Sequence, residues 1–202
     1  MTRAVVVYRS EYGSTQQYAQ WLAVDLWCDV FDCRSIRLED LQEYDTIIYG
    51  APLRAGGTVL GCKFLRKEIE MLGDKNLILF TCGISDPEVG KTRRLIQDWL
   101  IKNLTDEVLA HIKVFHLRGA LDYKHLSGVH TIAMAMRKRA IAGLDPAERT
   151  PEEQTLLDTY RKNANFMDRD AIRPIVKYIL RLSIRGIGPN SGASRLMDES
   201  LD

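Results

Sequence analysis

Short, continuous apolar runs recur along the chain, and we predict that each of them forms a buried strand. The first run, Ala4–Val7, contains no polar residue, which is typical of a parallel strand covered on both faces. By the same pattern, strands are predicted over residues 3–8, 29–33, 46–50, 77–82 and 113–117.

Segments with helical periodicity separate these strands. Tyr18, Leu22 and Leu26 fall four residues apart and predict a helix over residues 13–28. A second helix is expected after Thr58, which would be its N-cap, and a third over about residues 91–104. Strands that alternate with helices predict a parallel sheet with helices on both faces and right-handed crossovers.

Residues 126–166 interrupt this alternation, because they contain two helical patterns and no strand pattern. The first pattern covers about residues 129–141, and the second begins at Thr150 with a capping box and a proline at the first helical position. We interpret residues 124–168 as a helical insertion before the last helix, which should begin near Asp168 or Asp170. The chain is therefore expected to form one domain over residues 1–188, followed by a flexible tail over residues 189–202.

The composition excludes several classes of protein. The 202 residues can form one sizeable core, and the net charge of +1 provides no general attraction for nucleic acid. The four cysteines form no C-x-x-C pair and have no zinc-binding spacing, which fits a reducing cytoplasmic setting. The sequence shows neither a signal-peptide pattern nor an apolar run of about 18 residues, so no membrane span is predicted.

The loop after the first strand has the features of a phosphate-binding site. Ser10, Ser14 and Thr15 offer hydroxyl donors, and Gly13 permits a close approach of the backbone. The loop leads directly into a helix, whose free N–H groups favour an anion. An ordinary loop with a hydroxyl N-cap would have the same composition, so both interpretations stay open on this stretch alone. The sequence contains no G-x-x-x-x-G-K-[ST] motif for a nucleoside triphosphate.

At this point the chain resembles the flavodoxin-like FMN-binding proteins. The stretch Ser10-Glu11-Tyr12-Gly13-Ser14-Thr15 is similar to the phosphate motif of that family, and two more loops follow strands in the expected places. The stretch from Arg118 to Tyr123 looks like the last loop of the branch that includes the menaquinone-dependent protoporphyrinogen oxidases. The resemblance implies a doubly wound α/β fold with a five-stranded parallel sheet in the order 2-1-3-4-5.

The same resemblance implies the cofactor and the residues that bind it. The first loop would hold the FMN phosphate, and three further loops would surround the ring and the ribityl chain. The residues implied to bind FMN are Ser10, Glu11, Tyr12, Gly13, Ser14, Thr15, Pro52, Leu53, Arg54, Ala55, Gly56, Thr81, Cys82, Gly83, Gly119, Ala120, Leu121, Asp122 and Tyr123. Arg54 could also raise the flavin reduction potential by stabilising the reduced anion.

One departure from the family bears on the reaction. Electron-transfer flavodoxins typically enclose the ring between aromatic side chains, whereas the second and third loops here offer Leu53, Arg54, Cys82, Ile84 and Pro87. An open ring face could receive a flat organic substrate or a quinone. We therefore favour an FMN-dependent oxidoreductase, with a protoporphyrinogen-like compound as one possible electron donor. The alternative is an electron carrier that serves partner redox proteins.

Other chemically active residues have simpler interpretations. Cys82 ends a buried strand and is expected to be a core thiol rather than a nucleophile. The four histidines are scattered, and His125 is the best candidate for a catalytic role because it follows the last loop. Met134 and Met136 either pack within the insertion or form an apolar lid. The basic helices, with Arg137–Arg139 and Arg173, Lys177, Arg181 and Arg185, are solvated faces or a peripheral contact with a membrane.

Overall fold

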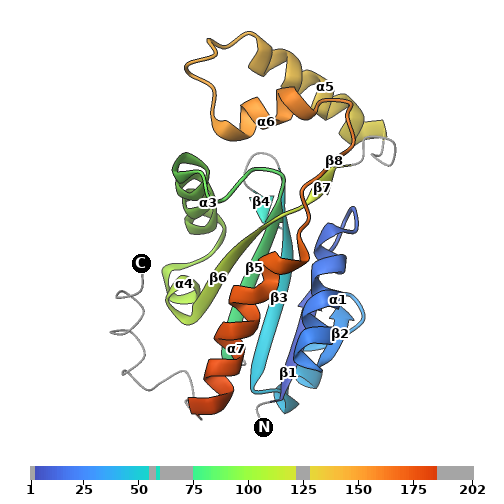
Figure 1. Cartoon of the computed structure of the whole chain (residues 1–202), viewed down its shortest axis with the longest axis vertical. Helices are drawn as coiled ribbons and strands as arrows, with labels where there is room; N and C mark the ends of the chain where they lie inside the picture. The colour runs from blue at the N-terminus through green and yellow to red at the C-terminus, as the bar shows by residue number, and fades with distance from the viewer. Residues whose placement is uncertain (1–2, 55–57, 60–74, 122–127, 186–202) are drawn as a thin grey trace.

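A parallel sheet forms the centre of the protein, as a computed structural model shows (Figure 1). The structure describes residues 3–54, 58–59, 75–121 and 128–185. The parallel strands are β1 (Ala4–Tyr8), β2 (Asp29–Asp32), β3 (Thr46–Arg54), β5 (Asn76–Gly83) and β6 (Ile112–Arg118). They lie in the order β2-β1-β3-β5-β6, which is the 2-1-3-4-5 order of the five parallel strands and confirms the predicted fold.

Helices cover both faces of the sheet because successive strand residues point to opposite sides. On one face, α1 (Ser14–Leu26) and α7 (Arg173–Arg185) pack against a cluster that includes Val6, Ile48 and Phe80. On the other face, α3 (Gly90–Asn103) and α4 (Asp106–His111) pack against a cluster that includes Val7, Tyr49 and Leu79. These two cores confirm that the continuous apolar runs belong to strands buried on both sides.

The predicted helical insertion is present beyond one end of the sheet. It contains α5 (Gly128–Ala142) and α6 (Pro151–Thr159), and Figure 1 shows both helices above the carboxyl ends of the strands. The predicted capping box at the start of α6 is also present, since Glu153 N–H donates to Thr150 Oγ1 and Thr150 N–H donates to the Glu153 carboxylate. Two 3-10 helices, η1 (Leu38–Glu43) and η3 (Arg169–Ile172), complete the described elements, and η3 leads directly into α7.

Three details differ from the sequence-based expectations. The third strand does not end at Gly50, because it continues to Arg54 and pairs there with β4 (Thr58–Val59). Thr58 is consequently in a strand and is not the N-cap of a helix, while the rest of the helix predicted after it lies outside the described residues. The insertion also contains a strand after all, since β8 (Ala164–Asn165) pairs antiparallel with β7 (Ala120–Leu121).

Candidate functional site

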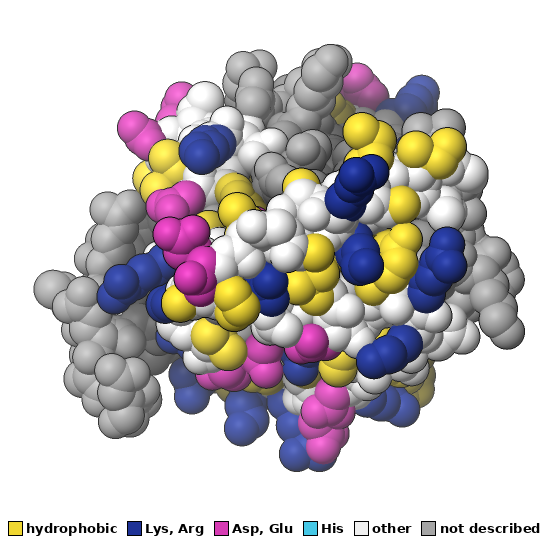
Figure 2. All heavy atoms as spheres, turned by 90° about the horizontal axis from the view of Figure 1, so that it is seen from above, with side chains coloured by type: hydrophobic (Ala, Val, Ile, Leu, Met, Phe, Trp, Pro, Cys, Tyr) yellow, Lys and Arg dark blue, Asp and Glu magenta, His cyan; other side chains and the backbone are white. Residues whose placement is uncertain are grey.

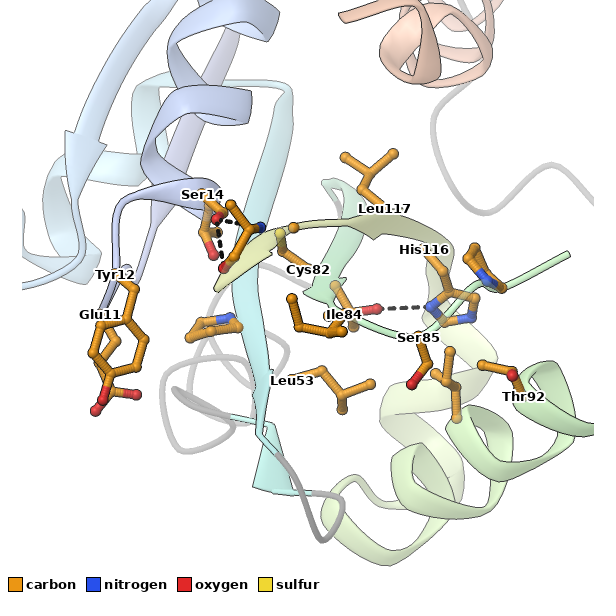
Figure 3. Close-up of a pocket in the computed structure, with 18 of the residues that line it drawn as sticks. Glu11, Tyr12, Ser14, Leu53, Cys82, Ile84, Ser85, Thr92, His116 and Leu117 are labelled. Carbon is orange, nitrogen blue, oxygen red and sulfur yellow. Dashed lines mark hydrogen bonds between the residues drawn. The ribbon is translucent and has the colours of Figure 1, made fainter. Parts of the chain in front are cut away.

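A cavity of about 410 Å³ opens at the carboxyl ends of the parallel strands. Its size is within the usual range of small-molecule sites, roughly 300–1,000 Å³. The first loop, the ends of β3 and β5, the last loop, α3 and both insertion helices contribute to its wall. Figure 3 shows the central part, where Tyr12 and Ser14 come from the first loop, Leu53 from β3 and Cys82 from β5. This is the edge at which doubly wound sheets bind ligands.

The first loop turns sharply into α1 at Gly13. This residue has a φ of +91°, a conformation that other L-residues rarely adopt, and it is the N-cap of the helix. Gly13 N–H donates to Ser10 Oγ over 3.1 Å, so the serine shapes the loop. No hydroxyl side chain caps α1, which removes the interpretation as an ordinary hydroxyl cap. The first-turn N–H groups of an α-helix have no partner within the helix, so this terminus can accept an anion.

Ser14 connects the first loop to the last loop. Its Oγ accepts a hydrogen bond from Ala120 N–H at 2.9 Å and lies 3.5 Å from the Ala120 carbonyl oxygen. Gly119 lies between the two loops, where an added Cβ would come within 2.9 Å of Cys82 Sγ and 3.3 Å of Ser14 Cβ. Only a residue without a side chain fits here, and the first and last loops are therefore in direct contact beside the cavity.

Arg118 fixes the position of the last loop against the third loop. Its guanidinium donates to the Ile84 carbonyl oxygen, at 3.2 Å from Nη2, and lies 3.4 Å from the Asp86 carboxylate. The guanidinium carbon also lies 3.8 Å from the centre of the Phe166 ring, in a cation–π contact. Arg118 thus connects the loop after β5 to the segment that returns from the insertion.

Two of the predicted polar site residues lie deep in the wall of the cavity. Thr15 is only 2% exposed, and its hydroxyl forms a hydrogen bond with the Cys82 thiol. Burial raises the pKa of the Cys82 thiol to about 12. Cys82 is therefore protonated at neutral pH, and its 5% exposure is that of a core residue, as predicted.

The apolar part of the cavity is formed by Pro52, Leu53 and Ile84 together with side chains of α3 and the insertion. No aromatic side chain comes from the described residues of the second and third loops. Aromatic rings reach the cavity from elsewhere: Tyr12 of the first loop is 41% exposed, and Trp99 of α3 lies in the wall.

The structure describes most of the residues that the family resemblance implies, and the others lie outside the described ranges. The cavity wall contains Ser10, Glu11, Tyr12, Ser14, Thr15, Pro52, Leu53, Thr81, Cys82, Gly83, Gly119 and Ala120. Gly13 lies in the same loop as Ser14. Arg54 and Leu121 are described only as strand residues, in β3 and β7. Ala55, Gly56, Asp122 and Tyr123 lie outside the described residues, as does His125.

His116 is the site residue that the sequence did not indicate. Its Nδ1 lies 2.7 Å from Thr81 Oγ1 across the β5–β6 pair, and both residues line the cavity. Burial, with a smaller contribution from Arg93, lowers the pKa of His116 to about 4, so the ring is neutral at neutral pH. Alternate residues of β6 point to the same face, so Ile112, Val114 and residue 116 all lie on the face that α3 covers. This alternation in the sequence could have indicated His116.

The fold and the cavity define a doubly wound α/β protein with a cavity of small-molecule size at the carboxyl edge of its sheet. The described residues contain no cluster of His, Cys, Asp or Glu suited to a metal ion. Within the same ranges, no helix has the length and apolarity needed to cross a membrane.

Comparisons with known proteins place the chain in a family. The family model for the flavodoxin domain matches residues 5–145, which is more than half of the chain. The chain therefore belongs to the flavodoxin domain family. No curated protein matches it.

Several solved flavodoxins are similar at low identity. Oxidised flavodoxin 2 from Bacillus cereus is 14% identical with a TM-score of 0.40, over 77% of this chain and 93% of that one. A flavodoxin from the domain Archaea is 20% identical with a TM-score of 0.38, over 56% of this chain and 84% of that one. A Fusobacterium nucleatum flavodoxin mutant bound to flavin mononucleotide is 15% identical with a TM-score of 0.35, over 59% of this chain and 71% of that one.

Proposed function

We propose that the protein is an FMN-binding flavoprotein that transfers electrons, and that the cavity at the carboxyl edge of the sheet is its cofactor site. Membership of the flavodoxin domain family supports this proposal. The donor set supports FMN in particular, because the turn at Gly13 and the start of α1 provide uncharged donors for a phosphate. The bound flavin would supply the redox chemistry, and the protein would supply position and electrostatics.

The open space beside Gly13 supports a phosphate site at this loop. A Cβ added at this residue would meet nothing within 4 Å, so the loop is open on the side of the glycine. No acidic residue lies in the first turn of α1 to compete for its N–H groups.

A comparison of FMN with riboflavin tests this proposal. Quenching of flavin fluorescence should show that the protein binds FMN at least about tenfold more tightly than riboflavin, because riboflavin lacks the phosphate that the α1 terminus would bind. Ser10→Asp keeps an acceptor for Gly13 N–H but adds a negative charge, so FMN affinity should fall about tenfold and riboflavin affinity should not change. Ser10→Asn is the matched neutral control. Equal affinity for FMN and riboflavin in the wild-type protein would contradict a phosphate site at this loop.

We further propose that the protein is an oxidoreductase acting on an organic substrate rather than a carrier that docks on partner proteins. The observation that carries this proposal is the participation of the insertion, because Met134 of α5 and Leu156 of α6 line the same cavity as the first loop. If the ring is bound as the family resemblance implies, Leu53 and Ile84 would take the place of the aromatic side chains that enclose it in electron-transfer flavodoxins. An apolar wall beyond the flavin is suited to a flat organic compound.

Anaerobic turnover separates the enzyme from the carrier. The FMN-loaded protein would be mixed with candidate organic donors, including protoporphyrinogen, and reoxidation by menaquinone would be followed through flavin absorbance. We expect reduction by one of the organic donors and reoxidation by the quinone. Rapid electron exchange with a ferredoxin-type protein, without turnover of any organic donor, would favour the carrier. The redox role of Arg54 remains a prediction, which midpoint potentials of Arg54→Ala would test.

Peripheral contact with a membrane is a further proposal, and α5 supports it. Ile132 and Met136 lie one helical turn apart and are 63% and 69% exposed, and the exposed Arg139 lies on the same face of the helix. Figure 2 shows basic and hydrophobic side chains interspersed on the face above the cavity. Co-sedimentation with anionic vesicles should therefore be weaker for the double variant Ile132→Ser, Met136→Ser. Unchanged sedimentation of this variant would contradict the contact.

A further inference from the structure

The cavity extends beyond the loops that would hold FMN and continues along α3. Its wall there consists of Thr92, Leu95, Ile96 and Trp99 from α3, together with the Thr81–His116 pair on the sheet. We refer to this part as the α3-side compartment. Figure 3 shows Ser85, Thr92 and His116 on one side of the cavity, with Ser14 and Cys82 on the other. Leu156 and Thr159 of α6 also line the cavity, so the insertion takes part in enclosing it.

Thr92 has a buried hydroxyl that forms no hydrogen bond with any residue that the structure describes. The residue is only 2% exposed, and within the described part of the chain its Oγ1 has no hydrogen-bond partner. A buried polar atom without a partner costs roughly 1–3 kcal/mol. Because Thr92 lines the cavity, a ligand in the compartment can supply the missing hydrogen bond.

His116 supplies a second polar group in the same wall. Its Nδ1 is occupied by Thr81, which leaves Nε2 as the polar atom available to a ligand. When the Thr81 hydroxyl donates to Nδ1, Nε2 carries the proton and is a donor. The ring is neutral at neutral pH, so it can form a hydrogen bond with an uncharged oxygen without attracting an anion.

Apart from the hydroxyl group of Ser85, the rest of the compartment wall is apolar among the residues that the structure describes. Leu95, Ile96 and Trp99 carry no charge, and Trp99 offers an indole ring for contact with a flat ligand. Among the described residues, the charged side chains that line the cavity are Glu11 and Arg137, which come from the first loop and from α5. A largely apolar space whose hydrogen-bonding groups are all neutral, with Thr92 and His116 among them, matches an uncharged aromatic compound with a carbonyl oxygen.

We propose that the α3-side compartment is the binding site of such a compound, a quinone, with its carbonyl oxygen hydrogen-bonded to Thr92 Oγ1 and His116 Nε2. This inference rests on the proposed function, since the quinone would occupy the part of the cavity that FMN leaves free. It assigns the organic substrate to side chains of α3 and β6, whereas the first and last loops are assigned to the cofactor. Thr92 and His116 are thus substrate-binding residues.

Titration calorimetry with menadione, a naphthoquinone, tests the assignment on the FMN-loaded protein. Thr92→Val preserves the shape of the side chain and removes only the hydroxyl, so we expect the Kd for menadione to rise about five- to tenfold, the loss of one hydrogen bond. Thr92→Ser should restore the wild-type Kd to within about twofold. Thr46→Val is the matched control, because Thr46 is equally buried but begins β3 at the opposite edge of the sheet.

The FMN affinity of each variant, measured separately, distinguishes failure of this inference from failure of the proposed function. Wild-type protein that does not bind FMN overturns both. Normal FMN binding with no binding of menadione, or with equal Kd values for wild type and Thr92→Val, overturns only the quinone site. A loss of FMN affinity in Thr92→Val also overturns it, because the compartment would then belong to the flavin. Weaker quenching of tryptophan fluorescence by menadione in Trp99→Phe would support the site independently of Thr92.

Discussion

Tyr18 connects three parts of the protein through one hydroxyl group. Tyr18 belongs to α1, and its side chain is completely buried. Its hydroxyl donates a hydrogen bond to the Arg118 carbonyl oxygen at 2.7 Å. The same oxygen accepts a hydrogen bond from Asp168 N–H at 3.0 Å. Arg118 precedes the last loop of the site, and Asp168 follows the insertion. Tyr18→Phe therefore removes a contact that holds both ends of the insertion to the core.

The expected loss of stability follows from these two hydrogen bonds. Each contributes roughly 1 kcal/mol net, and the carbonyl and N–H groups left in a part-buried setting add to the cost. We expect the free energy of unfolding to fall by about 2–3 kcal/mol, a factor of roughly 30 to 150 in the equilibrium constant. The phenyl ring still fills the same space, so no cavity contributes to this figure.

Urea unfolding of Tyr18→Phe measures this loss, with an unchanged m-value as the sign of an intact fold. Hydrogen exchange should also become faster at the Asp168 amide and in the insertion. Tyr8→Phe is the matched control, since it removes a hydroxyl from a half-buried tyrosine that packs against the same core. If Tyr18→Phe lost no more stability than Tyr8→Phe, the connection of the three segments through the hydroxyl would be refuted.

Three further predictions concern the site. Gly119→Ala should lower stability by about 1–3 kcal/mol and weaken FMN binding, because its Cβ would overlap Cys82 Sγ; wild-type melting and FMN affinity would contradict the contact. The free energy of unfolding should fall by about 3 kcal/mol as the pH is lowered from 6.5 to 4. In the unfolded chain His116 binds a proton at the ordinary pKa of histidine, whereas in the folded protein its pKa is about 4. His116→Phe should flatten this part of the stability profile, and an equally steep profile would refute the assignment. Cys82 should react with a thiol reagent only on unfolding, since it is 5% exposed with a pKa of about 12, and rapid labelling of the folded protein would contradict its burial.

The sequence predicted the parts of the fold that depend on local pattern. The run Ala4–Val7 and the spacing of Tyr18 and Leu22 are signals within a few residues, and both appear in the structure as expected. The end of β3 was missed because Pro52 and Leu53 look like a loop in sequence. They remain in a strand because Pro52 pairs with Cys82 of β5 and Leu53 with Val59 of β4, which are tertiary contacts.

The candidate site was predictable to a similar extent. Clustering of the strand-end loops followed from the parallel topology, and the first and last loops do meet, through Ser14 and Ala120. The roles of the hydroxyls did not follow, because Thr15 forms its hydrogen bond with Cys82, a residue distant in sequence. Thr92 was missed because its importance depends on burial beside a cavity that no local pattern reveals, whereas the alternation along β6 would have placed His116 on the α3 face.

The antiparallel pairing of the two-residue strands β7 and β8 makes the insertion a separable module. Ala120 pairs with Asn165 and Leu121 with Ala164, so the chain leaves the core and returns to it at adjacent positions. A short turn could join these strands in place of the segment between them, and the five-stranded sheet would keep its connections. Protein engineers could thus exchange the insertion for another segment and change what reaches the cavity without redesigning the fold that supports it.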